Sequence, residues 1–289
     1  MSRNNEDRLG AAMPAADSPA SVMASDEAGA SNAPLTFSTP TEFVELPSQG
    51  RYYPENHPLH KTETLEIRYM TAKDEDILSS KSLLKKGLAI DRFLNNVIVD
   101  KKVKIDDLLV GDKNAVLVAS RITGYGEIYS TNVVCPACAT NQTFDFDLGE
   151  TNINYADDLA ELNVELTQNN TFIVYLPRTK VNVEVRMLTG ADEKKLTKIM
   201  EHKKKHKLPE TTSTDQMRMY IISVNGHEDK QTIESLIQNL PAADARHLRD
   251  LYGKATPNVD LKHHFDCETC GYAQLMEVPF TADFFWPKQ

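Results

Sequence analysis

The feature that most constrains the fold is a pair of C-x-x-C motifs that together contain all four cysteines of the chain. The first is Cys135–Cys138 and the second is Cys267–Cys270, so about 130 residues separate them. Each motif places two sulfur atoms on one side of a tight turn, and two such turns supply four thiolates for a tetrahedral zinc ion. We therefore predict a structural Zn²⁺ that ties two distant segments together. The predicted ligands are Cys135, Cys138, Cys267 and Cys270.

Other states of these cysteines remain open at this point. Four reduced buried thiols and two disulfides both fit the count, and iron is a less favoured metal for the same ligands. Disulfides are disfavoured because Arg3 and Arg8 are followed by no apolar stretch of the kind that a secretory signal needs. His263 and His264 precede the second motif and are candidate substitute ligands, but four cysteines already complete the shell.

Composition excludes several classes of function. The formal net charge of −10 disfavours a general nucleic-acid-binding protein, which needs a basic excess to contact phosphates. The basic run His202–Lys207 is expected to be a solvated helix end, where cations are favoured. No run reaches the roughly 18 apolar residues of a membrane span. The sequence also lacks a glycine-rich phosphate loop, a nucleophile elbow and a metalloprotease motif, so we predict no enzymatic activity.

Hydrophobic periodicity predicts an α+β protein behind a disordered tail. Residues 1–40 are rich in Ala, Ser, Asn and Pro and contain too few large apolar side chains to offset the entropy of ordering. Alternating patterns predict strands over 64–70, 128–134, 143–148, 162–166, 172–176, 181–188, 259–265 and 274–278. Helical spacing covers 71–84, 90–98, 112–122, 189–207, 217–224, 233–240 and 242–252.

The chain also carries a weak internal repeat. The segment Arg68–Glu75 matches Arg186–Glu193, each with a threonine N-cap candidate followed by acidic residues. Leu46-Pro47 loosely matches Leu176-Pro177, and the two C-x-x-C motifs then fall at corresponding places. We predict two pseudo-repeated halves, 41–160 and 161–289, joined by a shared four-cysteine site. Chance similarity between amphipathic segments is the alternative.

Five motifs, taken in order, resemble a known family. They are the turn Leu46–Tyr53, the helix start Met70–Glu75, the two C-x-x-C motifs and the ending Phe284–Pro287. Over residues 42–289 the chain resembles the baseplate hub proteins of T-even-type contractile-tailed bacteriophages. The resemblance implies a non-enzymatic hub subunit or hub assembly factor whose partners are other phage baseplate hub proteins. It also implies a place in the host cytoplasm during assembly, with the virion tail baseplate as the alternative.

Two surfaces are candidates for these contacts. One is the turn Pro47–Pro54 and the other is the C-terminal aromatic cluster Phe284–Trp286, since aromatic side chains often dominate binding interfaces. Packing of the aromatic cluster against its own domain is the competing interpretation. The main functional alternative is a zinc-knuckle nucleic-acid-binding protein, which would bind DNA or RNA in a salt-sensitive way.

Overall fold

The computed structural model describes residues 38–156, 159–280 and 282–285, so nearly all of the predicted tail lies outside the described residues. The described chain is a mixture of helices and strands, which confirms the α+β prediction. The elements up to residue 156 are β1 (Thr41–Glu45), β2 (Thr64–Arg68), α1 (Ala72–Ser79), α2 (Lys81–Lys85), α3 (Ala89–Val97), α4 (Val110–Tyr125), β3 (Ile128–Val134), β4 (Asn141–Asp147), η1 (Leu148–Glu150) and β5 (Asn152–Asn154).

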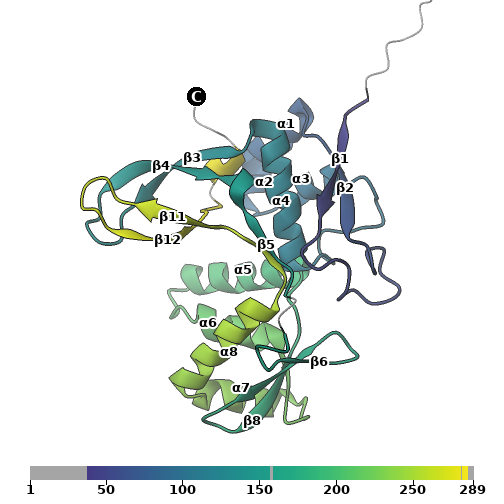
Figure 1. The fold of residues 1–289 in the computed structure, drawn as a ribbon, viewed down its shortest axis with the longest axis vertical. Coiled ribbons are helices and arrows are strands. Elements are labelled where there is room, and N and C mark those ends of the chain that lie inside the picture. Colours follow the sequence, from purple (N-terminus) through teal and green to yellow (C-terminus); the bar gives the residue numbers. More distant parts are fainter. Residues whose placement is uncertain (1–37, 157–158, 281, 286–289) are drawn as a thin grey trace, which may run out of the picture. The chain divides into compact units, whose positions relative to one another are not determined.

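The later elements lie beyond residue 159 and include the second C-x-x-C motif. They are β6 (Glu165–Leu166), β7 (Phe172–Leu176), β8 (Val181–Val185), α5 (Gly190–Lys205), α6 (Thr212–Tyr220), β9 (Ile221–Val224), α7 (Lys230–Asn239), α8 (Ala242–Ala255), β10 (Asn258–Asp260), β11 (Lys262–Asp266), β12 (Ala273–Glu277) and η2 (Ala282–Phe285). Figure 1 shows the hairpins β3–β4 and β11–β12 side by side, projecting away from the helices.

The starts of α1 and α5 have the same hydrogen-bond arrangement. In each, a threonine N-cap and the aspartate three residues later form a capping box, which satisfies backbone N–H groups that the helix leaves free. At α1, Arg68 Nη1 donates to Asp74 Oδ2 at 2.6 Å. At α5, Arg186 Nη1 donates to Asp192 Oδ2, also at 2.6 Å. An arginine at the end of β2 and one directly after β8 therefore hold the two helix starts.

A buried aspartate in the first turn of α4 fixes the turn Pro47–Pro54. Asp112 accepts hydrogen bonds from the Ser48 N–H at 2.9 Å, the Ser48 hydroxyl at 2.6 Å and the Tyr53 hydroxyl at 2.7 Å. Ser48 and Tyr53 are 1% and 2% exposed, and Tyr52 is also buried. The prediction of a binding surface on this turn is therefore wrong for these side chains, because they pack inside the protein.

Asp244 in the first turn of α8 has an equivalent role. It accepts hydrogen bonds from the Arg178 N–H at 3.0 Å, and from the Thr179 N–H and hydroxyl at 2.7 and 2.9 Å. These donors directly follow the Leu176-Pro177 pair, just as Ser48 directly follows the earlier Leu-Pro pair. Asp244 thus joins a helix start to the turn after β7.

The largest sheet among the described residues has the order β6-β7-β8-β9 and is antiparallel throughout. Its last strand corrects a prediction, because Met217–Val224 was expected to be helical and Ile221–Val224 is a strand. Val224 lies opposite Val183 of β8, and the turn that follows has positive φ at Asn225 and Gly226. A segment rich in β-branched residues before an Asn-Gly turn favours a strand over a helix end.

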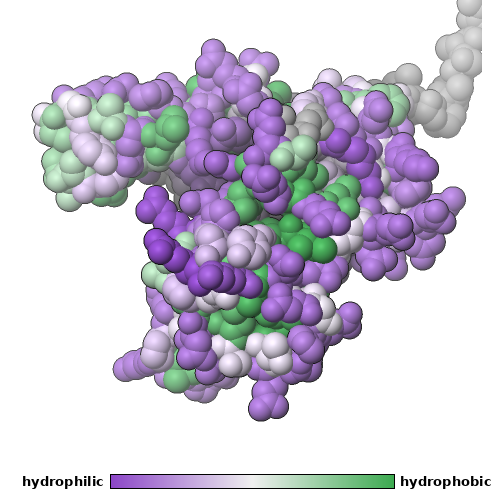
Figure 2. Space-filling model, turned by 60° about the horizontal axis from the view of Figure 1, so that its bottom comes forward, coloured by the Kyte–Doolittle hydropathy of each residue, from purple (hydrophilic) through white to green (hydrophobic). Residues whose placement is uncertain are grey.

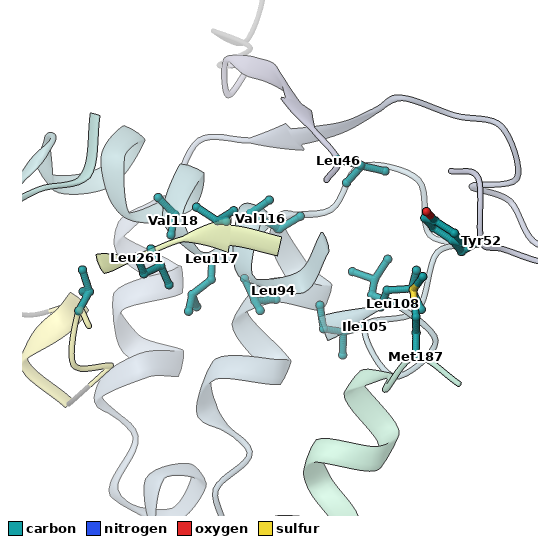
Figure 3. Packing of buried hydrophobic residues seen from close by; sticks show 14 of the residues in the cluster. Leu46, Tyr52, Leu94, Ile105, Leu108, Val116, Leu117, Val118, Met187 and Leu261 are labelled. Carbon is teal, nitrogen blue, oxygen red and sulfur yellow. The ribbon is translucent and has the colours of Figure 1, made fainter. Parts of the chain in front are cut away.

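One hydrophobic cluster extends across the described elements. Figure 3 shows its central part, where Met187, from the link between β8 and α5, lies beside Leu108. Leu261 lies near Leu117 of α4 in the same view. The segments before and after residue 160 therefore share a core. The other residues labelled in this region are Leu46, Tyr52, Leu94, Ile105, Val116 and Val118.

The C-terminal aromatic residues that can be described belong to this core. Phe284 and Phe285 are 1% and 2% exposed. The ring of Phe284 meets Tyr129 edge to face at 5.1 Å, and Phe285 meets Phe93 in the same way at 5.1 Å. These two side chains pack against their own domain instead of offering a binding surface. Trp286 lies outside the described residues.

Hydrophilic side chains cover most of the face in Figure 2, with hydrophobic areas at its centre and on the projecting hairpins. Exposed apolar side chains on the hairpins include Val134 and Leu275. Within the described ranges, no helix combines the length and the apolar character that crossing a bilayer requires.

Candidate metal centre

Two antiparallel hairpins hold the two C-x-x-C motifs. In the first, β3 pairs with β4 up to the pair Val134–Asn141, and the cysteine loop closes it. In the second, β11 pairs with β12 up to Asp266–Ala273, and the other cysteine loop closes that one. Alternating strand side chains give each hairpin one inward face. The two motifs therefore lie at equivalent ends of two hairpins (Figure 1).

The two loops share a backbone conformation. The Ala139 N–H donates to the Cys135 carbonyl at 2.9 Å, and the Gly271 N–H donates to the Cys267 carbonyl at 2.8 Å. Ala139 and Gly271 have φ of 56° and 68°, which is the left-handed region. Glycine adopts this region readily, whereas for alanine it costs roughly 1–2 kcal/mol. The first loop thus has the same conformation as the second, although its left-handed position is occupied by alanine instead of glycine.

The four sulfur atoms form one compact group. The Sγ atoms of Cys135 and Cys270 lie 3.8 Å apart, and those of Cys138 and Cys267 lie 3.7 Å apart. All four lie within 4.8 Å of one another. A tetrahedral zinc with Zn–S distances of about 2.3 Å needs sulfur separations of about 3.8 Å. The four cysteines form no disulfide in this structure, and the separations of their sulfur atoms fit a shared metal ion.

The electrostatics of the cluster also favour a cation. The Thr140 hydroxyl, 3.2 Å from Cys138 Sγ, lowers the pKa of that thiol to about 6. The backbone N–H of Cys270 lowers the pKa of Cys267. The backbone N–H of Tyr272 acts in the same direction on Cys270, but the neighbouring thiols outweigh it and raise the pKa of Cys270 to about 12. Four thiolates this close repel one another, and a divalent cation would relieve that repulsion.

Gln142 joins the two hairpins beside the sulfur group. Its Nε2 donates to the Asp266 carbonyl at 3.1 Å, and its Oε1 accepts from the Glu268 N–H at 3.2 Å. Phe144 of β4 and Phe265 of β11 also pack edge to face across the two hairpins, at 5.4 Å. One side chain of β4 thus fixes the backbone of the opposite cysteine loop. No pattern in the sequence marks Gln142 for this role, since a contact across hairpins leaves no local signal.

The other candidate residues lie away from the sulfur group. Neither His263 nor His264 belongs to it, and the ring of His263 instead packs edge to face on Phe146 at 5.5 Å. In the basic run, Lys203 forms an ion pair with Asp215 of α6 at 2.5 Å. That lysine therefore holds α5 against α6.

Comparison with known proteins gives one family match. A family model described as T4 bacteriophage base plate protein matches residues 39–286, which is most of the chain and nearly all of its described part. No curated protein and no solved structure matches the chain.

Proposed function

This chain belongs to the T4 bacteriophage base plate protein family, and from that premise we propose that it is a non-enzymatic structural or assembly protein of the baseplate hub. The match over residues 39–286 is the observation that carries the proposal, because it includes both halves and both cysteine loops. Its partners are other phage baseplate hub proteins. It acts in the host cytoplasm during assembly, with the tail baseplate as the place where it would persist.

We further propose that Cys135, Cys138, Cys267 and Cys270 bind one structural Zn²⁺. The proposal is supported by the grouping of their four sulfur atoms within 4.8 Å. Four thiolates fill a tetrahedral shell and leave no position for substrate water, so the ion would stabilise the fold without catalysing a reaction. In small domains such a site contributes on the order of 10 kcal/mol to folding.

The two hairpins are best explained as copies of one unit. We propose that 41–160 and 161–289 are pseudo-repeated halves, in which the metal joins equivalent loops. The matching arginine contacts at α1 and α5 support this proposal. The matching contacts of Asp112 and Asp244 with turns that follow Leu-Pro pairs support it further.

The role in assembly can be tested with purified full-length protein and the other baseplate hub proteins. We expect it to co-elute with at least one of them in size-exclusion chromatography. We also expect Cys267→Ser to lose both bound metal and this association. Lys205→Ala, which changes an exposed lysine of α5, is the matched control and should keep both.

The outcome against the role would be a folded, metal-loaded protein that binds none of these components and is absent from hub intermediates. A salt-sensitive mobility shift with DNA or RNA at physiological ionic strength would instead favour the nucleic-acid alternative.

A further inference from the structure

Among the residues that the structure describes, strand β1 is hydrogen-bonded along one edge, to β2. Its ladder with β2 is bracketed by two bonds of 2.8 Å, from the Tyr69 N–H to the Pro40 carbonyl and from the Leu46 N–H to the Glu63 carbonyl. Antiparallel hydrogen bonds fall on alternate residues. The even-numbered residues of β1 therefore bond to β2, and the backbone groups of its odd-numbered residues point away from β2.

The open edge presents the backbone of Phe43 and Glu45. In the described ranges, neither residue has a backbone hydrogen bond on this side. The far edge of β2 is covered, because the Val99 N–H donates to the Glu66 carbonyl at 3.1 Å. Within the described ranges, the open edge of β1 thus presents free donors and acceptors, and such an edge is a template for another strand.

An apolar groove of about 280 Å³ runs along this edge. Four consecutive β1 residues line it although their side chains alternate between faces, so the groove follows the edge of the strand. Its floor is an apolar stripe of α4, and its far wall includes β5. The lining residues of the floor and wall are Ala115, Val118, Ala119, Ile122, Thr151, Ile153 and Val259.

The strand that corresponds to β1 in the second half has no such opening. β7 pairs with β8 on one edge and with β6 on the other, where Leu166 lies opposite Phe172 and Glu165 opposite Ile173. An antiparallel strand therefore covers the edge of β7 that corresponds to the open edge of β1. By analogy with β6, the kind of segment that fits beside β1 is an antiparallel strand.

The charge of the groove indicates the chemistry of that segment. Glu42 and Glu45 are the ionisable residues that line it, and both are acidic. Burial raises the pKa of Glu42, as expected for a carboxylate beside an apolar floor. The Glu45 carboxylate accepts a hydrogen bond from the Tyr155 hydroxyl at 2.6 Å. A segment with basic side chains would complement this rim.

We propose that the groove beside β1 binds an extended segment of another polypeptide, with alternating apolar and basic side chains, as an added antiparallel strand. Its backbone bonds to Phe43 and Glu45, its apolar side chains cover the α4 floor on the face of Val44, and its basic side chains approach Glu45 on the opposite face. This inference deepens the proposed function, since it names the kind of segment through which a baseplate partner docks.

The test uses a peptide, so it does not depend on any baseplate component. The probe is the blocked peptide Lys-Val-Lys-Val-Lys-Val-Lys, titrated into full-length protein by calorimetry, with Glu-Val-Glu-Val-Glu-Val-Glu as the charge control. We expect saturable one-to-one binding of the lysine peptide and much weaker binding of the glutamate peptide. Phe43→Pro removes an outward N–H from an edge where proline is tolerated, and we expect it to weaken binding about tenfold.

Phe43→Ala is the matched control because it removes the exposed ring and keeps the N–H. We expect its affinity to stay within about twofold of the unchanged protein. If Phe43→Pro does not fold, Ala119→Lys serves instead, because it places a long basic side chain on the groove floor. That variant should abolish binding of the lysine peptide.

Three results would overturn the proposal. The first is no saturable binding to the unchanged protein, and the second is equal binding by Phe43→Pro. The third is peptide binding that needs the groove to be vacated first. If binding requires deletion of residues 1–38, the chain's own tail occupies the groove, and if it requires dilution of a dimer, a second copy does. A protein that binds the peptide but no baseplate component would instead count against the proposed function alone.

Discussion

The anchor at the start of α4 allows a quantitative prediction. In Asp112→Ala, three buried donors lose their acceptor, namely the Ser48 N–H, the Ser48 hydroxyl and the Tyr53 hydroxyl. A buried polar group left without a partner costs about 1–3 kcal/mol, and the two hydroxyls can rotate toward other acceptors. We therefore expect the free energy of unfolding to fall by about 3–5 kcal/mol.

The measurement is urea denaturation followed by circular dichroism, with bound metal checked to be equal in all variants. Asp244→Ala is the related test at α8: it also removes the acceptor of three donors, but these are only partly buried, so its loss should be smaller. Asp250→Ala changes an exposed aspartate of the same helix and should stay within about 0.5 kcal/mol of the unchanged protein. If Asp112→Ala loses less than about 1 kcal/mol, the anchor does not hold the turn in the way we describe.

Three further predictions concern helix packing and pH. A Cβ at Gly111 would lie 2.0 Å from the Pro257 carbonyl oxygen, so Gly111→Ala should lower the thermal midpoint strongly; an unchanged midpoint would contradict this contact. Gly253→Ala meets nothing within 4 Å and should stabilise α8 by up to about 1 kcal/mol. Although burial raises it, hydrogen bonding from Arg186 lowers the pKa of Asp192 to about 2 from 3.8. Because the folded-state value is the lower one, the resulting stability is present above about pH 4 and lost as the pH falls toward 2. The denaturation midpoint of the unchanged protein should therefore fall between about pH 4 and pH 2. The midpoint of Asp192→Asn should lack this part of the fall.

Local signals explain what could be predicted from the sequence. The two C-x-x-C turns and the threonine-aspartate helix starts depend on residues a few positions apart, and the structure has the capping boxes at Thr71 and Thr189. The sulfur atoms of the two motifs were expected to meet, and they lie in one group.

Contacts between distant residues explain what could not be predicted. Ser48 and Asp112 lie 64 residues apart, so their hydrogen bond leaves no pattern in either segment. The same holds for Gln142, which contacts the loop of the other hairpin. Ile221–Val224 was misassigned because its apolar residues also fit the end of a helix, and pairing with β8 decides in favour of a strand.

The central claim is that one metal ion joins the two halves through four thiolates. The most direct measurement is X-ray absorption at the zinc edge, together with the zinc content of full-length protein purified without added metal. We predict one zinc per chain, with four sulfur neighbours at about 2.3 Å and no nitrogen or oxygen ligand. A metal-free, folded protein with four free thiols, or a zinc with fewer than four sulfur neighbours, would contradict the claim.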